Sequence, residues 1–331
     1  MMLPYRSQLL ATTLLVGAAV ASPAAFAQTE APQAATTDTA GDIVVTGSLI
    51  RNPNLVSSTP VSVVNSDELN LRQTNTAEQV LRDLPGAVPS IGSAVNNGNG
   101  GSSYADLRGL GNFRNVVLLD GVRITPSSTV GRVDLNNVPL ALVERVDTLT
   151  GGAATTYGAD AVSGVINFVT RRDFSGVEAS VSNQITGRGD GKTFRGDVTI
   201  GANLDDGRGN VVLSLGYQKA DPVYQGARRI SLNNYTSTSG SVGGSGTTVP
   251  GRFTLPGQGY NTIIPATGAL RPYKGSTDGF NFNPFNVFQV PFERYNIYAA
   301  GHYDVADNVE VYARGMFSKN KVETIIAPSG V

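Results

Sequence analysis

Residues 143–174 read VERVDTLTGGAATTYGADAVSGVINFVTRRDF, and this stretch decides the fold. An amphipathic strand comes first, followed by two glycine-rich turns, a second apolar strand and a junction of basic and acidic residues. Glycine permits positive φ and close backbone approach, and small residues crowd the region between the two strands. The pattern therefore predicts a tightly folded β core rather than a loop.

Short motifs in this stretch occur in a fixed order. They are Val143-Glu144-Arg145-Val146, Tyr157-Gly158 and Gly164-Val165-Ile166-Asn167, preceded by Leu107-Arg108-Gly109 and Leu118-Leu119-Asp120-Gly121. Together they resemble the plug domain of TonB-dependent outer-membrane receptors. The resemblance implies plug–barrel contacts by Arg108, Glu144 and Arg145. One departure is Thr150-Gly151, which stands where many members carry Arg-Gly, so a basic locking group is missing.

The first 27 residues have the three parts of a secretory signal peptide. Arg6 makes a positive start, residues 9–21 are almost entirely apolar, and Ala25-Phe26-Ala27 is an A-x-A cleavage site. Cleavage is therefore predicted between Ala27 and Gln28. A membrane anchor is the alternative, but the apolar run is too short for the ~30 Å core of a bilayer.

An isolated β-prone run follows the signal peptide. Residues 28–41 hold Pro, Ala and Thr with almost no large apolar residue, which predicts a disordered leader. The next residues have no neighbouring strand, so strand addition to another protein is expected of Asp42, Ile43, Val44, Val45, Thr46 and Gly47. They are similar to a TonB box, which implies TonB and its inner-membrane energising complex as the partner. The alternative is that they form the first strand of the plug.

Residues 48–175 are predicted to form an α+β plug domain, a small mixed sheet with short helices. A strand is expected at residues 61–64, and Thr76 begins a helix with a capping box to Gln79. Residues 116–124 are expected to form a hairpin, because they contain the Asp-Gly dipeptide that a type I′ turn favours.

Residues 176–331 contain five runs in which apolar and polar residues alternate, with the length of a tilted membrane strand. The runs are residues 177–186, 192–204, 210–219, 292–305 and 309–321. Short connections at 205–209 and 306–308 alternate with a long insert at 221–291, as in outer-membrane barrels with long extracellular loops. We therefore expect the start of an antiparallel transmembrane β-barrel, with three tyrosines at the membrane interfaces: Tyr217, Tyr295 and Tyr303.

Five strands are too few for a closed barrel, because plugged transporters use about 22 strands and bacterial barrels use an even number. Lipid does not tolerate open sheet edges. The expectation is therefore a fragment or a truncated gene product in which the barrel is incomplete.

Composition and motifs exclude several function classes. Cys is absent, which excludes disulfides and thiolate metal sites, and the net charge of −1 gives no electrostatic case for nucleic acid. No Walker A pattern occurs, and Gly109-Leu110-Gly111 lacks the third glycine of a dinucleotide motif. Nothing in the sequence assembles a nucleophile, a base and oxyanion donors. We therefore expect no enzyme, no catalytic residues, no cofactor and no metal.

The resemblance implies active, ligand-gated uptake of a scarce nutrient across the cell outer membrane, with the plug inside the barrel lumen on the periplasmic side. Siderophore-iron, cobalamin and oligosaccharide receptors share these motifs. Ligand contacts are expected from the insert and from Asn96, Asn97 and Tyr104 at the plug apex, and outer-membrane lipid surrounds the strands. The alternative is a structural or adhesive outer-membrane protein with a plug-like domain. Crosslinking of residues 42–47 to TonB discriminates between the two.

Overall fold

The structure, a computed structural model, describes residues 61–72, 75–82, 84, 86–95, 100–151 and 153–325. The predicted signal peptide, its cleavage site at Ala27 and Gln28, the leader and the run at residues 42–47 lie outside the described residues. Asn96 and Asn97 lie outside them as well. No helix among the described residues is long and apolar enough to cross a membrane.

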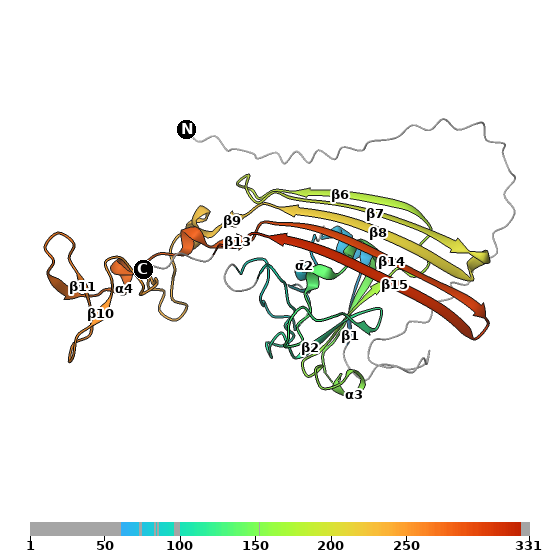
Figure 1. Ribbon diagram of the computed structural model, residues 1–331, viewed down its shortest axis with the longest axis horizontal. Helices are drawn as coiled ribbons and strands as arrows, with labels where there is room; N and C mark the ends of the chain where they lie inside the picture. Colours follow the sequence, from blue (N-terminus) through green and yellow to red (C-terminus); the bar gives the residue numbers. More distant parts are fainter. Residues whose placement is uncertain are drawn as a thin grey trace, which may run out of the picture. The chain divides into compact units, whose positions relative to one another are not determined.

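A five-stranded mixed sheet with the order β1-β4-β5-β2-β3 forms the N-terminal part of the described chain (Figure 1). Its strands are β1 (Val61–Asn65), β2 (Asn115–Leu119), β3 (Val122–Arg123), β4 (Val143–Leu149) and β5 (Gly164–Thr170). β2 and β5 run parallel, whereas the other pairs are antiparallel. The stretch that decides the fold thus supplies the adjacent strands β4 and β5, and the prediction of a β core is confirmed.

β5 is buried on both of its faces. Ile166 and Phe168 have no exposed surface and lie in one apolar cluster, while Val165, also without exposed surface, lies in a second cluster on the other face with Leu149 and Leu118. Burial of each such side chain stabilises the fold by about 1.5–3 kcal/mol. A strand covered on both faces needs a continuous apolar run rather than an alternating one, which explains the sequence Gly-Val-Ile-Asn-Phe-Val.

Short helices lie between these strands in the sequence, and the helix that follows Thr76 is the one that the sequence predicts. They are α1 (Ser66–Leu71), α2 (Ala77–Arg82) and α3 (Ala154–Tyr157). The predicted capping box is confirmed, since the Gln79 backbone N–H donates to Thr76 Oγ1 at 3.3 Å and the Thr76 N–H donates to Gln79 Oε1 at 3.3 Å. The predicted hairpin is also confirmed: Asp120 and Gly121 have φ of 51° and 76°, as a type I′ turn requires.

A second sheet, with the order β15-β14-β8-β7-β6, consists of five long antiparallel strands (Figure 1). They are β6 (Gly176–Gln184), β7 (Thr193–Leu204), β8 (Gly209–Ala220), β14 (Phe292–Ala306) and β15 (Val309–Val322). Their bounds agree with the five predicted runs to within two residues. Within the described residues β6 and β15 each have a neighbour on one side only, so the sheet is not closed. The predicted fold class, a mixed plug sheet followed by the start of an incomplete antiparallel barrel, is confirmed.

The second sheet buries its polar face and exposes its apolar face. On the buried face Thr199, Asn210 and Ser214 are only 2%, 1% and 4% exposed. The opposite face presents exposed aliphatic side chains on three strands: Val198, Ile200, Leu213, Leu215 and Ile297. A sheet in water has the reverse arrangement, whereas strands of an outer-membrane barrel turn apolar side chains to lipid and polar ones inward.

The insert contains strands that sequence analysis missed. They are β9 (Val223–Tyr224), β10 (Phe253–Thr254), β11 (Tyr260–Ile263), β12 (Leu270–Pro272) and β13 (Val287–Gln289), with the short helix α4 (Gly275–Asp278). A paired contact of Arg271 with Asp278, at 2.6 and 2.8 Å, joins β12 to α4, and the hydrogen bonds from Arg271 lower the pKa of the Asp278 carboxyl. Strands of two to four residues carry too little periodicity to be recognised in a sequence.

A lysine in the middle of the exposed apolar face should prevent assembly of the sheet in a membrane. Leu213 and Leu204 are 38% and 37% exposed, but Leu213 lies in the middle of β8 and Leu204 lies at the end of β7 beside a turn. We expect Leu213→Lys to cost about 2–4 kcal/mol and Leu204→Lys about 0–1 kcal/mol, because the penalty falls toward the membrane surface. Recovery of each variant in the outer-membrane fraction measures this difference. Equal recovery would contradict a lipid-facing surface.

Candidate functional site

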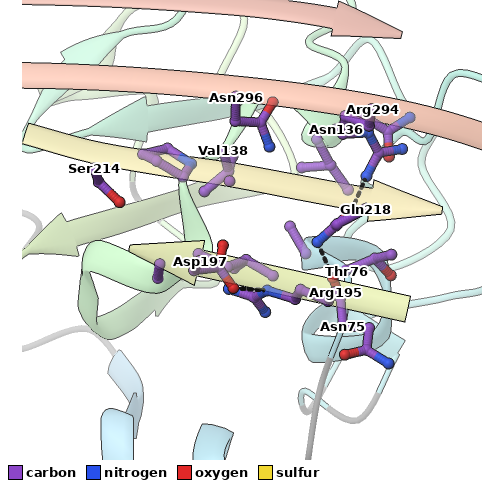
Figure 2. A pocket seen from close by; sticks show the side chains of 16 residues that line it. Asn75, Thr76, Asn136, Val138, Arg195, Asp197, Ser214, Gln218, Arg294 and Asn296 are labelled. Atoms are coloured by element: carbon purple, nitrogen blue, oxygen red, sulfur yellow. Dashed lines mark hydrogen bonds and ion pairs between the residues drawn. The ribbon is translucent and has the colours of Figure 1, made fainter. Parts of the chain in front are cut away.

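Polar side chains of the second sheet hydrogen-bond to the plug sheet and its loops (Figure 2). Gln218 on β8 donates from Nε2 to the backbone carbonyl of Asn75 at 2.7 Å, and its Oε1 accepts from Arg294 Nη1 at 2.9 Å. Ser182 on β6 donates to Asn75 Oδ1 at 2.8 Å. The residue that precedes the capping box of α2 is therefore held by two different strands.

Arg294 on β14 is the central charge of this interface. It is 4% exposed, and its Nε donates to Asn320 Oδ1 on β15 at 2.6 Å. Two buried plug carboxylates, Glu78 and Asp134, attract the guanidinium electrostatically. A buried charge is tolerated when it is both hydrogen-bonded and compensated, and here the compensation comes from the plug.

The two plug carboxylates are fixed by hydrogen bonds of their own. Glu78 Oε2 accepts from the Ser93 N–H at 3.0 Å and from Ser103 Oγ at 2.7 Å. Asp134 Oδ1 accepts from the Ser103 N–H at 3.0 Å and from the Asn136 N–H at 3.1 Å. Burial raises the pKa of the Asp134 carboxyl, and the two backbone hydrogen bonds oppose this shift. The loop around Ser93 and Ser103 is thereby tied to α2 and to the 3-10 turn at Leu135–Asn137.

A second contact comes from the turn of the β2–β3 hairpin. Asp120 binds β5 through the Thr170 N–H at 2.7 Å, accepts from the Tyr298 hydroxyl of β14 at 3.3 Å and lies 3.7 Å from Arg314 of β15. Arg314 also donates to the Leu119 carbonyl at 2.9 Å. Asp120 thus shapes the turn through its positive φ and joins the plug sheet to two long strands.

Further contacts lie where the plug sheet leads into β6. His302 Nε2 is 3.3 Å from Asp173 Oδ1, Arg172 pairs with Glu310, and Asn210 donates to the Phe174 carbonyl at 2.8 Å. The partners lie on β8, β14 and β15, so the segment between β5 and β6 is bound by strands that follow it later in the sequence.

The interface is nearly filled. A cavity of about 10 Å³ lies between the plug residues Asn75 and Asn136 and the strand residues Asp197, Gln218 and Asn296 (Figure 2). Such a space is at the lower limit for a single water molecule. A solute larger than water does not fit in this cavity while the plug and the strands are in contact.

Four predicted site residues lie among the described residues. Tyr104 is 9% exposed and stacks under the guanidinium of Arg132 at 4.9 Å. Arg145 pairs with Asp147 at 3.2 Å inside the plug sheet, while Arg108 and Glu144 are exposed. Within the described part of the chain these three charged residues make no hydrogen bond or ion pair to the long strands. The ligand-binding and plug–barrel roles of these residues stay predictions.

Sequence analysis missed the residues that do join plug and strands. They are Asn75, Glu78, Asp120, Asp134, Gln218, Arg294 and Arg314. The strand members carried a usable signal, because they are long polar side chains on the inward face of alternating strands. The plug members carried little, since Glu78 occupies an apolar helix face and Asp134 precedes a turn.

No group of three or more His, Cys, Asp or Glu that could hold a metal ion occurs among the described residues. Most polar groups of the interface are instead engaged with one another, whereas Asn75 Nδ2 and Asn296 Oδ1 are buried without a hydrogen-bond partner among the described residues. The arrangement supports a mechanical contact between two parts of the chain.

Residues 54–165 match the family described as TonB-dependent Receptor Plug Domain. This part of the chain is similar to TonB-dependent receptor plug domains. The matched residues include β1 to β4, α2, the Asp120 turn and the start of β5, so the contacts above join a segment similar to this plug family to the long strands.

Three solved structures show the same fold. A mutant ferric enterobactin receptor of Pseudomonas aeruginosa in complex with enterobactin is 17% identical, with a TM-score of 0.53 over 80% of this chain. The siderophore receptor PirA of Acinetobacter baumannii is 20% identical with a TM-score of 0.52, and the unliganded ferric citrate transporter FecA is 17% identical with a TM-score of 0.51, each over 81% of this chain. The chain spans about a third of their length, namely 34%, 32% and 32%.

Removal of the Arg294 charge should loosen the plug locally. Arg294→Met removes the positive charge that attracts the buried Glu78 and Asp134. Glu78 keeps its ion pair with Arg82, whereas Asp134 has no other ion-pair partner among the described residues, so we expect a cost of about 3 kcal/mol. The backbone N–H groups of Ser93 and Ser103 donate hydrogen bonds to these carboxylates. We expect these two amides to exchange about 100-fold faster in hydrogen-exchange measurements. Arg208→Met, at an exposed turn, is the matched control and should leave them unchanged. Unchanged exchange in Arg294→Met would show that Arg294 does not hold the plug.

Proposed function

We propose that the protein is a TonB-dependent receptor of the cell outer membrane that takes up a scarce nutrient. One observation carries this proposal: a TonB-dependent receptor plug lies against the polar face of a sheet whose apolar face is exposed, leaving a cavity of only about 10 Å³. A closed polar interface of this kind suits a gate, because it stops passage until the plug is displaced.

Chelated iron is the nutrient class that we favour over cobalamin and oligosaccharides. The similar structures are a ferric enterobactin receptor, a siderophore receptor and a ferric citrate transporter. The ligand would be captured by the insert at residues 221–291 and by Asn96, Asn97 and Tyr104 at the plug apex. The insert supplies a suitable aromatic and cationic group, since Arg252 lies over the rings of Tyr260 and Tyr273 at 4.1 and 5.5 Å.

Energy for transport would arrive from TonB through residues 42–47. An extended segment that adds a strand to a partner sheet gains its affinity from main-chain hydrogen bonds. Ligand binding would release this segment to the periplasm, and TonB would then pull on the plug that follows it.

The chemistry of the plug–strand interface suits displacement by force. The contacts of Gln218, Arg294 and Asp120 are hydrogen bonds and ion pairs. Beside them, Val212 and Tyr298 of the long strands pack into the apolar cluster of the plug. A typical intramolecular hydrogen bond contributes only about 0.5–1.5 kcal/mol net, since water replaces the lost partner. An interface built from such bonds can open in stages as water enters.

Growth of a deletion strain tests the proposal. We expect loss of growth when one ferric siderophore is the only iron source, with normal growth on excess iron salts and on all carbon sources. Crosslinking of residues 42–47 to TonB should depend on that siderophore. A growth defect confined to an oligosaccharide carbon source would show that the nutrient is a sugar and not chelated iron. An adhesion defect without crosslinking to TonB would support the adhesive alternative.

A further inference from the structure

Three neighbouring strands carry a row of charged residues on the exposed face of the second sheet. Glu293 of β14 pairs in register with Lys219 of β8 on one side and with Lys321 of β15 on the other. These three share the strand face of the exposed side chains Ile297 and Leu215. The row therefore lies on the lipid-facing side and not on the side that contacts the plug.

An aromatic row lies next to the charged row on the same face of the sheet, toward the middle of the strands. Two residues along each strand, Tyr295 pairs with Tyr217, and their ring centroids are 5.1 Å apart. Phe194 of β7 extends this row, with its ring centroid 6.2 Å from that of Tyr217. Tyr and Trp girdles mark the membrane–water boundary of barrels, so the charged row occupies the level of the lipid headgroups.

Tyr303 marks the other membrane–water boundary of the sheet. It lies on the same face of β14 as Tyr295, eight residues further on, which is about 27 Å of strand. On a strand tilted by about 35–45° this corresponds to a rise of about 19–22 Å, which is on the scale of the ~25 Å apolar band of outer-membrane barrels. Tyr303 is next to the short turns, whereas the charged row is next to the insert. Short turns face the periplasm and long connections face outward, so the row faces the outer leaflet.

A cavity opens at the charged row. Its volume is about 390 Å³, and its lining includes Lys219, Glu293 and Lys321 together with Tyr224 and Phe292. Small-molecule sites usually have about 300–1,000 Å³ and combine apolar walls with a few polar groups. The space is therefore large enough for a headgroup.

The polar groups of the row are available to a ligand. In the described part of the chain, Lys219 and the nearby Lys319 make no ion pair within 4 Å, and Lys219 is attracted by Glu293 across the strands without direct contact. Lys321 lies 3.9 Å from Glu323, and because these side chains are 69% and 77% exposed the pair holds Lys321 weakly. Glu293 Oε1 accepts from the hydroxyls of Tyr217 and Tyr295 at 3.0 and 2.9 Å, which fixes the carboxylate, and Oε2 has no hydrogen-bond partner among the described residues.

We propose that this row binds the phosphorylated sugar headgroup of an outer-leaflet glycolipid. The lysine ammonium groups donate to phosphate oxygens, and Glu293 Oε2 accepts from a sugar hydroxyl. The acyl chains of the same lipid pass over the aromatic row onto the exposed aliphatic side chains below it. Continuity between the cavity and the lipid-facing surface favours a lipid over a free anion. Asp221 and Glu323 also line the cavity and favour a headgroup that carries hydroxyl donors beside its phosphate.

Lipid binding to the purified protein in detergent tests this site. The probes are lipid A, which is a phosphorylated disaccharide lipid, phosphatidic acid, phosphatidylcholine and inorganic phosphate. We expect lipid A to bind at least about tenfold more tightly than phosphatidylcholine, and the double variant Lys219→Gln, Lys321→Gln to lose about tenfold in affinity for lipid A. Lys274→Gln, in the insert and outside the row, is the matched control and should bind as the unaltered protein does.

Two further measurements separate the parts of the proposal. Glu293→Gln should lower the affinity for lipid A by about threefold. It should leave the affinity for phosphatidic acid unchanged, because that lipid has no sugar hydroxyl. Inorganic phosphate at the concentration of lipid A should not displace it. Lipid A affinity that is unchanged in the double variant, or equally reduced in Lys274→Gln, would overturn the site, and displacement by phosphate would show a simple anion site instead.

Discussion

Replacement of Val44 by proline is expected to abolish TonB-dependent uptake and to leave ligand binding intact. Residues 42–47 are proposed to pair with TonB as an added strand, and such pairing depends on backbone N–H and C=O groups. Proline removes the N–H donor and fixes φ, so at least about 100-fold of the transport rate should be lost. Uptake of the labelled siderophore and its equilibrium binding to cells, measured on the same strain, separate the two effects.

Val44→Ala is the matched control for this prediction. Alanine removes the same side chain and keeps the backbone donor, so uptake should fall by no more than about threefold. If alanine and proline reduce uptake equally, the side chain of Val44 and not its backbone carries the interaction. Loss of binding together with uptake would instead assign residues 42–47 to the fold of the plug, which is the alternative that the sequence leaves open.

The long strands could be predicted because their signal is strong and repeated. Each has at least nine residues and alternates with a period of two, and the turns between them are short. The sequence also indicates which face of the sheet is turned to lipid. Long polar side chains such as Gln218 and Arg294 occupy one set of alternate positions on the strands, and aliphatic side chains occupy the other. Physical chemistry then assigns the polar set to the side away from lipid.

The contacts between plug and strands could not be predicted, for a physical reason. They join residues more than a hundred positions apart, as Gln218 with Asn75 and Tyr298 with Asp120 do. Such pairs depend on how two sheets are oriented, and no local pattern encodes orientation. The family motifs led instead to Arg108, Glu144 and Arg145. Of these, only Arg145 forms an ion pair among the described residues, and its partner is Asp147 inside the plug.

Gly164 is the position where a single methyl group should do most damage to the plug. It begins β5 with φ of 142°, and a Cβ atom there would lie 2.3 Å from the Leu149 carbonyl oxygen and 2.9 Å from Leu107 Cδ1. The oxygen belongs to the backbone of β4, so the clash can be relieved only by separating two buried strands. We expect Gly164→Ala to destabilise the plug by about 4 kcal/mol or more.

Two other glycines separate the clash from the backbone strain. Gly121, in the β2–β3 turn, has φ of 76° with nothing within 4 Å of an added Cβ, so Gly121→Ala should cost about 1–2 kcal/mol from φ alone. Gly187, between β6 and β7, also has open space around it and no left-handed φ, so Gly187→Ala should change stability by less than about 0.5 kcal/mol. Hydrogen exchange of the β5 amides ranks the three variants.

The loss of folding stability caused by Gly164→Ala determines whether the plug stays folded as a whole. Domains are stable by only about 5–15 kcal/mol, so a loss of about 4 kcal/mol removes a large share of that margin and should expose the plug to protease. A Gly164→Ala variant as resistant as Gly187→Ala would mean that β4 and β5 are not in close contact. If instead Gly164→Ala unfolds the plug while the long strands still reach the membrane, solutes should enter without TonB wherever those strands are part of a closed barrel. That result would identify the filled plug–strand interface as the gate.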